Sequence, residues 1–130
     1  MKIREDYTCP LEIAHDIMKG KWKPIILFQL QKEPVSLSAL ERSIAGISQK
    51  MLLEQLKELQ AFGLVDKHTF NGYPLRVEYS LTPERGRRML EAVRIMQQIG
   101  VDIMVEQGQT DFLDAKGIAY SKESCPQKSG

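Results

Sequence analysis

The sequence predicts a mainly α-helical domain with one small β-hairpin, and three observations support this fold class. Apolar residues recur at helical spacing in 48–62 and again in a longer segment, 83–105. Between them, an Asn-Gly pair at 71–72 separates two β-prone runs, 64–70 and 76–81, and such a pair is a strong hairpin signal. We therefore expect several helices, then a hairpin, then a long helix.

Two helices are expected before residue 37. Pro10 suits the first position of a short helix, and Gly20 can adopt the left-handed conformation just after its end. A second helix should begin near Lys21 or Pro24 and stop before Glu33. Its dense apolar composition indicates a central, mostly buried helix. Residues 34–36 then form a short extended link, and a third helix begins at residue 37 or 38.

The fourth helix gives the strongest local signal. Gly46 lies in the turn before it, and Ser48 can cap it by accepting a hydrogen bond from a backbone N–H. At about 100° per residue, three leucines gather on one side, Leu52, Leu56 and Leu59, and a mostly polar set gathers on the opposite side, Lys50, Leu53, Glu54 and Lys57. Gln49 lies at the exposed N-terminal end.

The hairpin completes a recognisable order. On its second strand Val77, Tyr79 and Leu81 share one face, so that face can pack on the core while the other meets solvent. Thr82-Pro83-Glu84 then combines a capping residue, a first-position proline and an early acid, which are signs of a helix start. Helix, turn, helix and hairpin in this order indicate a winged helix-turn-helix, which places one helix in the major groove of double-stranded DNA.

The candidate DNA-binding residues are the exposed ones of the fourth helix and one cation of the wing: Ser48, Gln49, Lys50, Leu53, Lys57 and Arg76. Gln49 is placed to reach base edges, and Arg76, with Lys67 and His68 in or beside the wing, to hold phosphate. Two other interpretations stay open. The polar residues could be the solvated side of an ordinary amphipathic helix, or the fold could be a protein-interaction module that has lost DNA binding.

Charge is unevenly distributed along the chain. The net charge is +1, but residues 19–94 carry 13 Lys or Arg against 8 Asp or Glu. This mild basic excess coincides with the predicted DNA-reading module.

Several sequence blocks resemble the HxlR-type winged helix-turn-helix regulators, relatives of the MarR group. The blocks are Cys9-Pro10, Gly20-Lys21-Trp22, the segments 46–52 and 56–59, Gly63-Leu64-Val65 and the segment 76–82, and the resemblance spans about residues 8–100. It implies a homodimeric bacterial or archaeal DNA-binding regulator whose terminal helices form most of the dimer interface. We accordingly expect its DNA site to be an inverted repeat.

The long fifth helix carries an apolar stripe of Leu90, Val93, Met96, Ile103 and Met104. The stripe could pack within its own domain, with methionine as flexible filler. We favour a dimer seam, formed with the first helix and its face of Leu11, Ala14, Ile17 and Met18, because a small winged helix rarely needs so long an extra helix for its core.

The expected domain division follows from this interpretation. Residues 1–106 form the winged helix-turn-helix domain with its dimerisation helices, and residues 107–130 form a C-terminal extension. The extension is expected to be disordered in part, from Lys122 onward, while Phe112, Leu113, Ile118 and Tyr120 can still dock on the body.

Cys9 is a candidate redox sensor. Amide dipoles at a helix start stabilise a thiolate, and in some members of the family that this chain resembles, a cysteine at this place followed by proline senses oxidants or electrophiles. The alternative is a small packed residue. Residues 30–110 contain no second cysteine, unlike members that pair the sensor with one near the reading helix, so Cys125 in the tail is the available partner. An oxidant or a small molecule is the expected effector.

Composition argues against other classes of protein. The 130 residues are 42% hydrophobic and 27% charged, with no apolar run long enough to span a membrane and no signal-peptide core, so a cytoplasmic location without membrane attachment is expected. His15 and His68 are isolated, and Cys9, Glu12 and His15 would spread over a wide arc of one helix. We therefore expect no metal site, no cofactor and no enzymatic activity.

Overall fold

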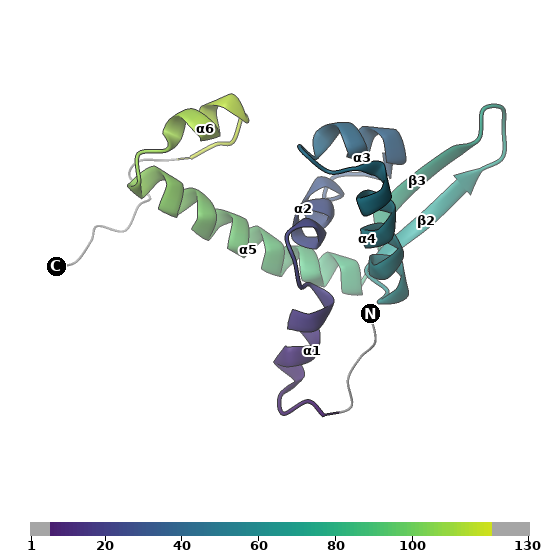
Figure 1. Cartoon of the computed structure of the whole chain (residues 1–130), viewed down its shortest axis with the longest axis horizontal. Coiled ribbons are helices and arrows are strands. Elements are labelled where there is room, and N and C mark those ends of the chain that lie inside the picture. The colour runs from purple at the N-terminus through teal and green to yellow at the C-terminus, as the bar shows by residue number, and fades with distance from the viewer. Residues whose placement is uncertain (1–5, 121–130) are drawn as a thin grey trace. The chain divides into compact units, whose positions relative to one another are not determined.

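The computed structural model describes residues 6–120 of the chain. In order, its elements are α1 (Pro10–Ile17), α2 (Trp22–Gln29), β1 (Val35–Ser36), α3 (Leu37–Ser43), α4 (Gln49–Ala61), β2 (Val65–Phe70), β3 (Arg76–Leu81), α5 (Arg85–Glu106) and α6 (Thr110–Ala115). The predicted order of helices, hairpin and long helix is confirmed (Figure 1). Contacts divide the chain into two compact units, Met1–Glu91 and Ala92–Gly130.

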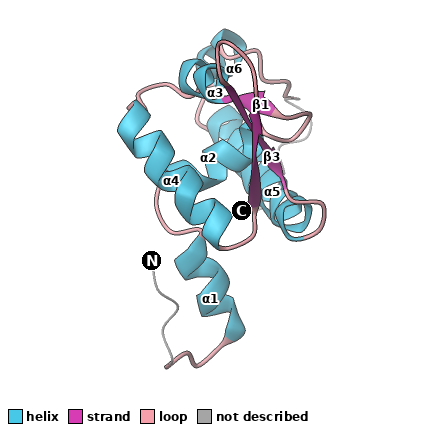
Figure 2. Cartoon of the chain, turned by 90° about the vertical axis from the view of Figure 1, so that its right-hand side faces the viewer, coloured by secondary structure: helices cyan, strands magenta, loops and turns pink. Residues whose placement is uncertain are grey.

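The first unit contains a three-stranded antiparallel sheet in the order β1-β3-β2. Figure 2 shows its strands in magenta beside α2 and α4. The expected link at 34–36 contributes β1, in which Val35 pairs with Tyr79. In the hairpin, Val65 pairs with Leu81 and Phe70 with Arg76, so residues 71–75 form the loop at its tip. The hairpin extends beyond α3 and α4 (Figure 1).

Apolar side chains of α2, α4 and the sheet form the core of this unit. Leu52, Leu56 and Leu59 of α4 are at most 1% exposed, as their spacing predicts. Ile26, Leu27 and Leu30 from the second helical segment are equally buried, and Tyr79 and Leu81 present the inner face of β3. The leucine side of α4 is therefore fixed against the core, which settles which side of the helix faces solvent.

One charged residue lies within this core. The side chain of Lys23, on α2, is 4% exposed, and its Nζ lies 2.6 Å from Oε1 of Glu58, on α4. The hydrogen bond from Lys23 lowers the pKa of Glu58 and outweighs the opposite effect of burial. The sequence predicts a buried α2 but gives no sign that its lysine is buried, because the ammonium group of a lysine normally lies in solvent.

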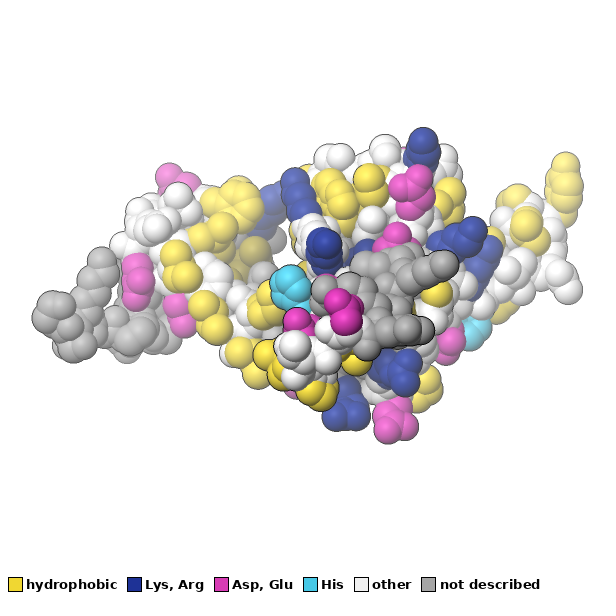
Figure 3. All heavy atoms as spheres, turned by 60° about the horizontal axis from the view of Figure 1, so that its bottom comes forward, with side chains coloured by type: hydrophobic (Ala, Val, Ile, Leu, Met, Phe, Trp, Pro, Cys, Tyr) yellow, Lys and Arg dark blue, Asp and Glu magenta, His cyan; other side chains and the backbone are white. Residues whose placement is uncertain are grey.

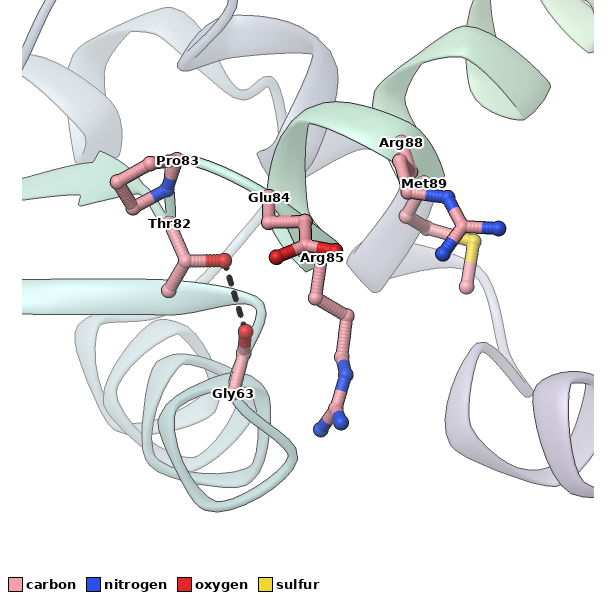
Figure 4. Close-up of a pocket in the computed structure, with 7 residues that line it drawn as sticks. All are labelled: Gly63, Thr82, Pro83, Glu84, Arg85, Arg88 and Met89. Carbon is pink, nitrogen blue, oxygen red and sulfur yellow. Dashed lines mark hydrogen bonds between the residues drawn. The ribbon is translucent and has the colours of Figure 1, made fainter.

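A hydrogen-bonded junction ties the end of α4 to the start of α5. The Thr82 hydroxyl donates to the carbonyl oxygen of Gly63 at 2.8 Å (Figure 4). It also accepts from the backbone N–H of Gly86 at 2.7 Å. The guanidinium of Arg85 donates to the carbonyl of Phe62 at 2.8 Å. Thr82 thus caps α5 as predicted, although the helix begins at Arg85, two residues later than Pro83.

The predicted apolar stripe of α5 is only partly buried. Leu90 and Val93 are buried, whereas Met96 is 60% and Ile103 46% exposed. At 100° per residue, the exposed pair lies about 60–140° around the helix from the buried pair, so buried and exposed residues occupy two adjoining faces. The exposed face also includes Ile95 and Ile99, at 58% and 54%, which the sequence analysis missed.

The second unit continues through α6. Within it, Leu113 is fully buried and Phe112 is 48% exposed, and the docking of this segment on the rest of the chain stays a prediction. The expected disorder from Lys122 onward, and Cys125, lie outside the described residues.

Candidate nucleic-acid interface

The reading helix of the predicted motif is α4, and its start is built by local hydrogen bonding. Gly46, at φ +84°, makes the turn after α3 in a conformation that L side chains rarely adopt. The Ser48 hydroxyl then accepts a hydrogen bond from the backbone N–H of Met51 at 3.1 Å. The predicted cap is confirmed, and α4 begins at Gln49 with no acidic residue in its first turn.

The side chains predicted to face DNA are on the solvent side of α4. Ser48, Gln49, Lys50 and Lys57 are exposed, and Leu53 is 41% exposed. Gln49, Leu53 and Lys57 are spaced four residues apart, so they form one row along the helix. The structure thus gathers the candidate residues of α4 on one accessible surface.

An open groove joins this helix to the wing. It is lined by the starts of α3 and α4 and by the end of the hairpin loop: Ser36, Leu37, Ser38, Glu41, Gln49, Pro74, Leu75, Arg76 and Val77. Gln49 and Arg76, which are 27 positions apart in the sequence, therefore line the same groove. The carboxylate of Glu41 lies in its wall and disfavours phosphate there.

Arg76 is not a free cation. Its guanidinium forms an ion pair with the carboxylate of Glu78 and lies 5.7 Å from the centre of the Phe70 ring. His68, on the same face of the hairpin, shares a hydrogen bond of 3.1 Å with Ser80. The side chain of Arg76 is still 67% exposed, so a phosphate could approach it, in competition with Glu78.

The loop of the wing is apolar, which the sequence analysis missed. Tyr73 is fully exposed, Leu75 is 65% exposed, and Phe70 at the end of β2 is 48% exposed. In Figure 3 several hydrophobic side chains lie at the outer end of the hairpin. The available signal was the lack of any charged residue in 71–75, between two strands that carry several.

Cys9 lies at the N-cap of α1 and is exposed. Its backbone N–H donates to the carboxylate of Glu12 at 3.0 Å, and the carboxylate also accepts from the backbone and hydroxyl of Thr8. These bonds fix the start of the helix, and no residue of α1 is buried. The predicted position of Cys9 is confirmed, and its sulfur is accessible to a small reagent.

A second open pocket lies beside the junction that Thr82 makes. It is lined by Gly63, Thr82, Pro83, Glu84, Arg85, Arg88 and Met89 (Figure 4).

Within residues 6–120, no three His, Cys, Asp or Glu side chains gather as metal ligands, and no helix in that range is long and apolar enough to cross a membrane.

Comparison with known proteins gives concordant matches. The chain is 42% identical over 76 residues to the HTH-type transcriptional regulator YkvN of Bacillus subtilis strain 168, a match that spans 58% of this chain and 64% of YkvN. A structure assigned to the MarR family of transcriptional regulators from Porphyromonas gingivalis W83 is 37% identical, with a TM-score of 0.70, covering 77% of this chain and 97% of that one. The oxidised form of the redox regulator HypR is also 37% identical, with a TM-score of 0.67, covering 71% and 94%.

YkvN and the Porphyromonas gingivalis protein are described as transcriptional regulators, and HypR is described as a redox regulator. The fold is a winged helix-turn-helix, with α3 and α4 as the helix-turn-helix and β2–β3 as the wing. The model of the HxlR-like helix-turn-helix family matches residues 17–108. The chain therefore belongs to the HxlR-like helix-turn-helix family of transcriptional regulators.

Proposed function

We propose that this chain regulates transcription by binding a specific DNA sequence as a homodimer. The observation that carries the proposal is the open groove shared by Gln49, at the start of α4, and Arg76, in the wing. A helix whose first residues are exposed can enter a major groove, while a neighbouring wing contacts the backbone beside it. Ser48, Gln49, Lys50, Leu53, Lys57 and Arg76 are the residues that we assign to this contact.

The roles of these residues differ in kind. Gln49 can pair with a base edge through its amide, since Gln reads adenine with two hydrogen bonds in the major groove. Lys50, Lys57 and Arg76 neutralise phosphates, and the Ser48 hydroxyl can donate a hydrogen bond to one. Contacts to phosphate position the protein, whereas contacts to bases specify the sequence.

Dimerisation is proposed from the exposed apolar face of α5. Ile95, Met96, Ile99 and Ile103 are each 46–60% exposed. Figure 3 shows hydrophobic side chains gathered on the surface of the C-terminal unit. Such a face is typical of an interaction surface, and we propose that a second copy of the chain covers it, with α1 as a further contributor. A two-fold dimer would bind an inverted repeat with half-site centres about 34 Å apart.

We also propose that modification of Cys9 alters DNA binding. The support is its exposure at the start of α1 and the similarity of this chain to HypR, which is described as a redox regulator. With a quinone, the sulfur would add to a ring carbon and the thiol proton would end on a quinone oxygen. An adduct there would disturb α1 and, through the dimer, the spacing of the two reading helices.

The decisive experiment measures binding to duplexes selected by the protein from a random library, at several salt concentrations. Gln49→Ala should change the selected sequence. Arg76→Ala should weaken binding to every duplex and reduce the slope of log K against log salt by about one unit for each subunit. If wild type and the double variant Gln49→Ala/Lys50→Ala bind all duplexes equally, the assignment of these residues is wrong. A wild type that binds no duplex would instead favour a protein-interaction module.

The regulatory step has its own test. Benzoquinone treatment should reduce binding of the wild type and of Cys125→Ser to the selected duplex, and should leave Cys9→Ser unaffected. Equal loss of binding by the wild type and Cys9→Ser would exclude Cys9 as the sensor. If no variant responds, Cys9 is a structural residue and any inducer is a non-covalent ligand.

A further inference from the structure

We propose that Leu53 reads the methyl group of a thymine in the major groove. The proposal rests on the proposed DNA-binding function and adds a base identity to it. Within α4, which is described throughout, Leu53 is the one large apolar side chain that the protein leaves exposed, at 41%. The other leucines of the helix, at 52, 56 and 59, are at most 1% exposed.

The position of Leu53 places it among groups suited to DNA. It follows Gln49 by one helical turn and precedes Lys57 by another, so a base-pairing amide and a phosphate-binding ammonium flank it in one row. Its solvent-facing neighbours are Lys50 and Glu54. A helix that brings Gln49 and Lys57 to DNA therefore brings Leu53 there as well.

The chemistry of the major groove limits what an apolar side chain can recognise. Each base presents donors and acceptors there, and among the four ordinary bases thymine alone adds an apolar group, its C5-methyl. Leu53 can make no hydrogen bond through its side chain, so contact with a donor or acceptor would desolvate that group without replacement. Contact with the methyl group instead removes apolar surface from water on both sides.

The size of the expected loss of affinity follows from the apolar surface that the methyl contact buries. Removing one methyl group from an apolar contact costs roughly 0.8 kcal/mol, which corresponds to a fall in affinity of about fourfold at 25 °C. In a two-fold dimer on an inverted repeat, the loss applies once in each half-site. Removing the methyl group from both half-sites would therefore lower the affinity about fifteenfold. The effect is confined to one thymine position in each half-site.

The test replaces thymine by uracil, one position at a time, in a duplex that the wild-type protein has selected from a random library. Uracil keeps every hydrogen-bonding group of thymine and lacks only the methyl group. We expect one position at which wild type binds the uracil duplex about fourfold more weakly in each half-site. Leu53→Ala should bind the thymine duplex more weakly and should no longer distinguish the two at that position.

Two controls separate this contact from other effects. Lys57→Ala, on the same row, should weaken binding to both duplexes while keeping the full difference between thymine and uracil. Leu53→Met keeps an apolar side chain of similar size and should keep part of the difference. Because Leu53 is exposed, urea unfolding should give Leu53→Ala a stability close to that of the wild type.

Each contrary outcome is distinct. If the wild type binds thymine and uracil duplexes equally at every position, or if the difference persists in Leu53→Ala, Leu53 does not read a methyl group, although the DNA-binding function still holds. If the selection yields no bound duplex at all, the proposed function fails, and this inference fails with it.

Discussion

The ammonium group of Lys23, on α2, lies 2.6 Å from the carboxylate of Glu58, on α4, and the two partners differ in their access to water. The Lys23 side chain is 4% exposed, whereas that of Glu58 is 34% exposed. The ion pair joins the central helix to the side of the reading helix that faces away from its exposed row. Its two partners should therefore respond differently to removal.

Removing the carboxylate should cost more stability than removing the ammonium group. Glu58→Ala leaves a buried charge without a partner, and we expect a loss of roughly 3 kcal/mol in the free energy of unfolding. Lys23→Met removes the buried charge and leaves a carboxylate that water can still reach, so the loss should be about 1 kcal/mol or less. Urea titration of both variants measures the difference; equal losses would mean that Lys23 reaches water in solution.

The same pair predicts a pH dependence in acid. The pKa of Glu58 lies below its ordinary value of 4.5, chiefly because Lys23 donates a hydrogen bond to its carboxylate. A carboxyl group of this kind stabilises the fold fully above its unfolded pKa, and the contribution is lost as the pH falls through its lower folded value. Glu58→Gln serves as the reference because its side chain is neutral at every pH.

We therefore expect the wild type to exceed Glu58→Gln in stability at pH 6 and the difference to shrink below about pH 4.5. Urea unfolding of both proteins across pH 3–6 measures it. A difference that stays constant over this range would show that the carboxylate is not stabilised by Lys23.

Gly86 should not tolerate a side chain. A Cβ atom there would overlap the carbonyl oxygen of Leu64 and approach the Thr82 hydroxyl to 2.9 Å, which would force the α4–α5 junction apart. We expect Gly86→Ala to cost about 2 kcal/mol or more. Gly100→Ala is the matched control, since a Cβ at Gly100 meets nothing within 4 Å and alanine is favoured in a helix by about 1 kcal/mol. Thermal unfolding measures the effect, and only Gly86→Ala should have a lower melting temperature than the wild type.

Ile99 offers a direct test of the proposed dimer. Ile99→Asp places a charge on the exposed apolar face of α5, and we expect it to shift the protein from dimer to monomer at micromolar concentration. Gln98→Asp adds the same charge at an exposed neighbouring position about 100° away around the helix and should leave the dimer intact. Sedimentation velocity distinguishes these states. A wild type that sediments as a monomer, or an Ile99→Asp dimer, would exclude this seam.

Most of the DNA-reading module could be predicted from sequence because its signals are local. The leucine spacing of α4, the cap at Ser48 and the β-prone runs around residues 71–72 each depend on neighbours within a few positions. The strand β1 could not be predicted in this way, because two residues carry no periodicity and pairing with Tyr79 spans more than forty positions.

Other features depend on the environment that the fold supplies. The burial of Lys23 requires Glu58 to lie opposite it, and the pairing of Arg76 with Glu78 requires their side chains to turn toward each other on one strand. In α5, the sequence gives apolar residues at helical spacing, but it does not say which of two adjoining apolar faces is covered. Only the structure shows that Val93 is buried and Ile99 is exposed.

The two faces of α5 also constrain its length. Each residue inserted into or deleted from an α-helix turns everything beyond it by about 100°. A change of one residue between Val93 and Ile99 would therefore rotate the exposed face away from its present direction while every side chain remained apolar. Homologous chains that keep both faces can exchange one aliphatic side chain for another here, but should differ in length elsewhere, in loops such as 71–75, where added residues alter no helical phase.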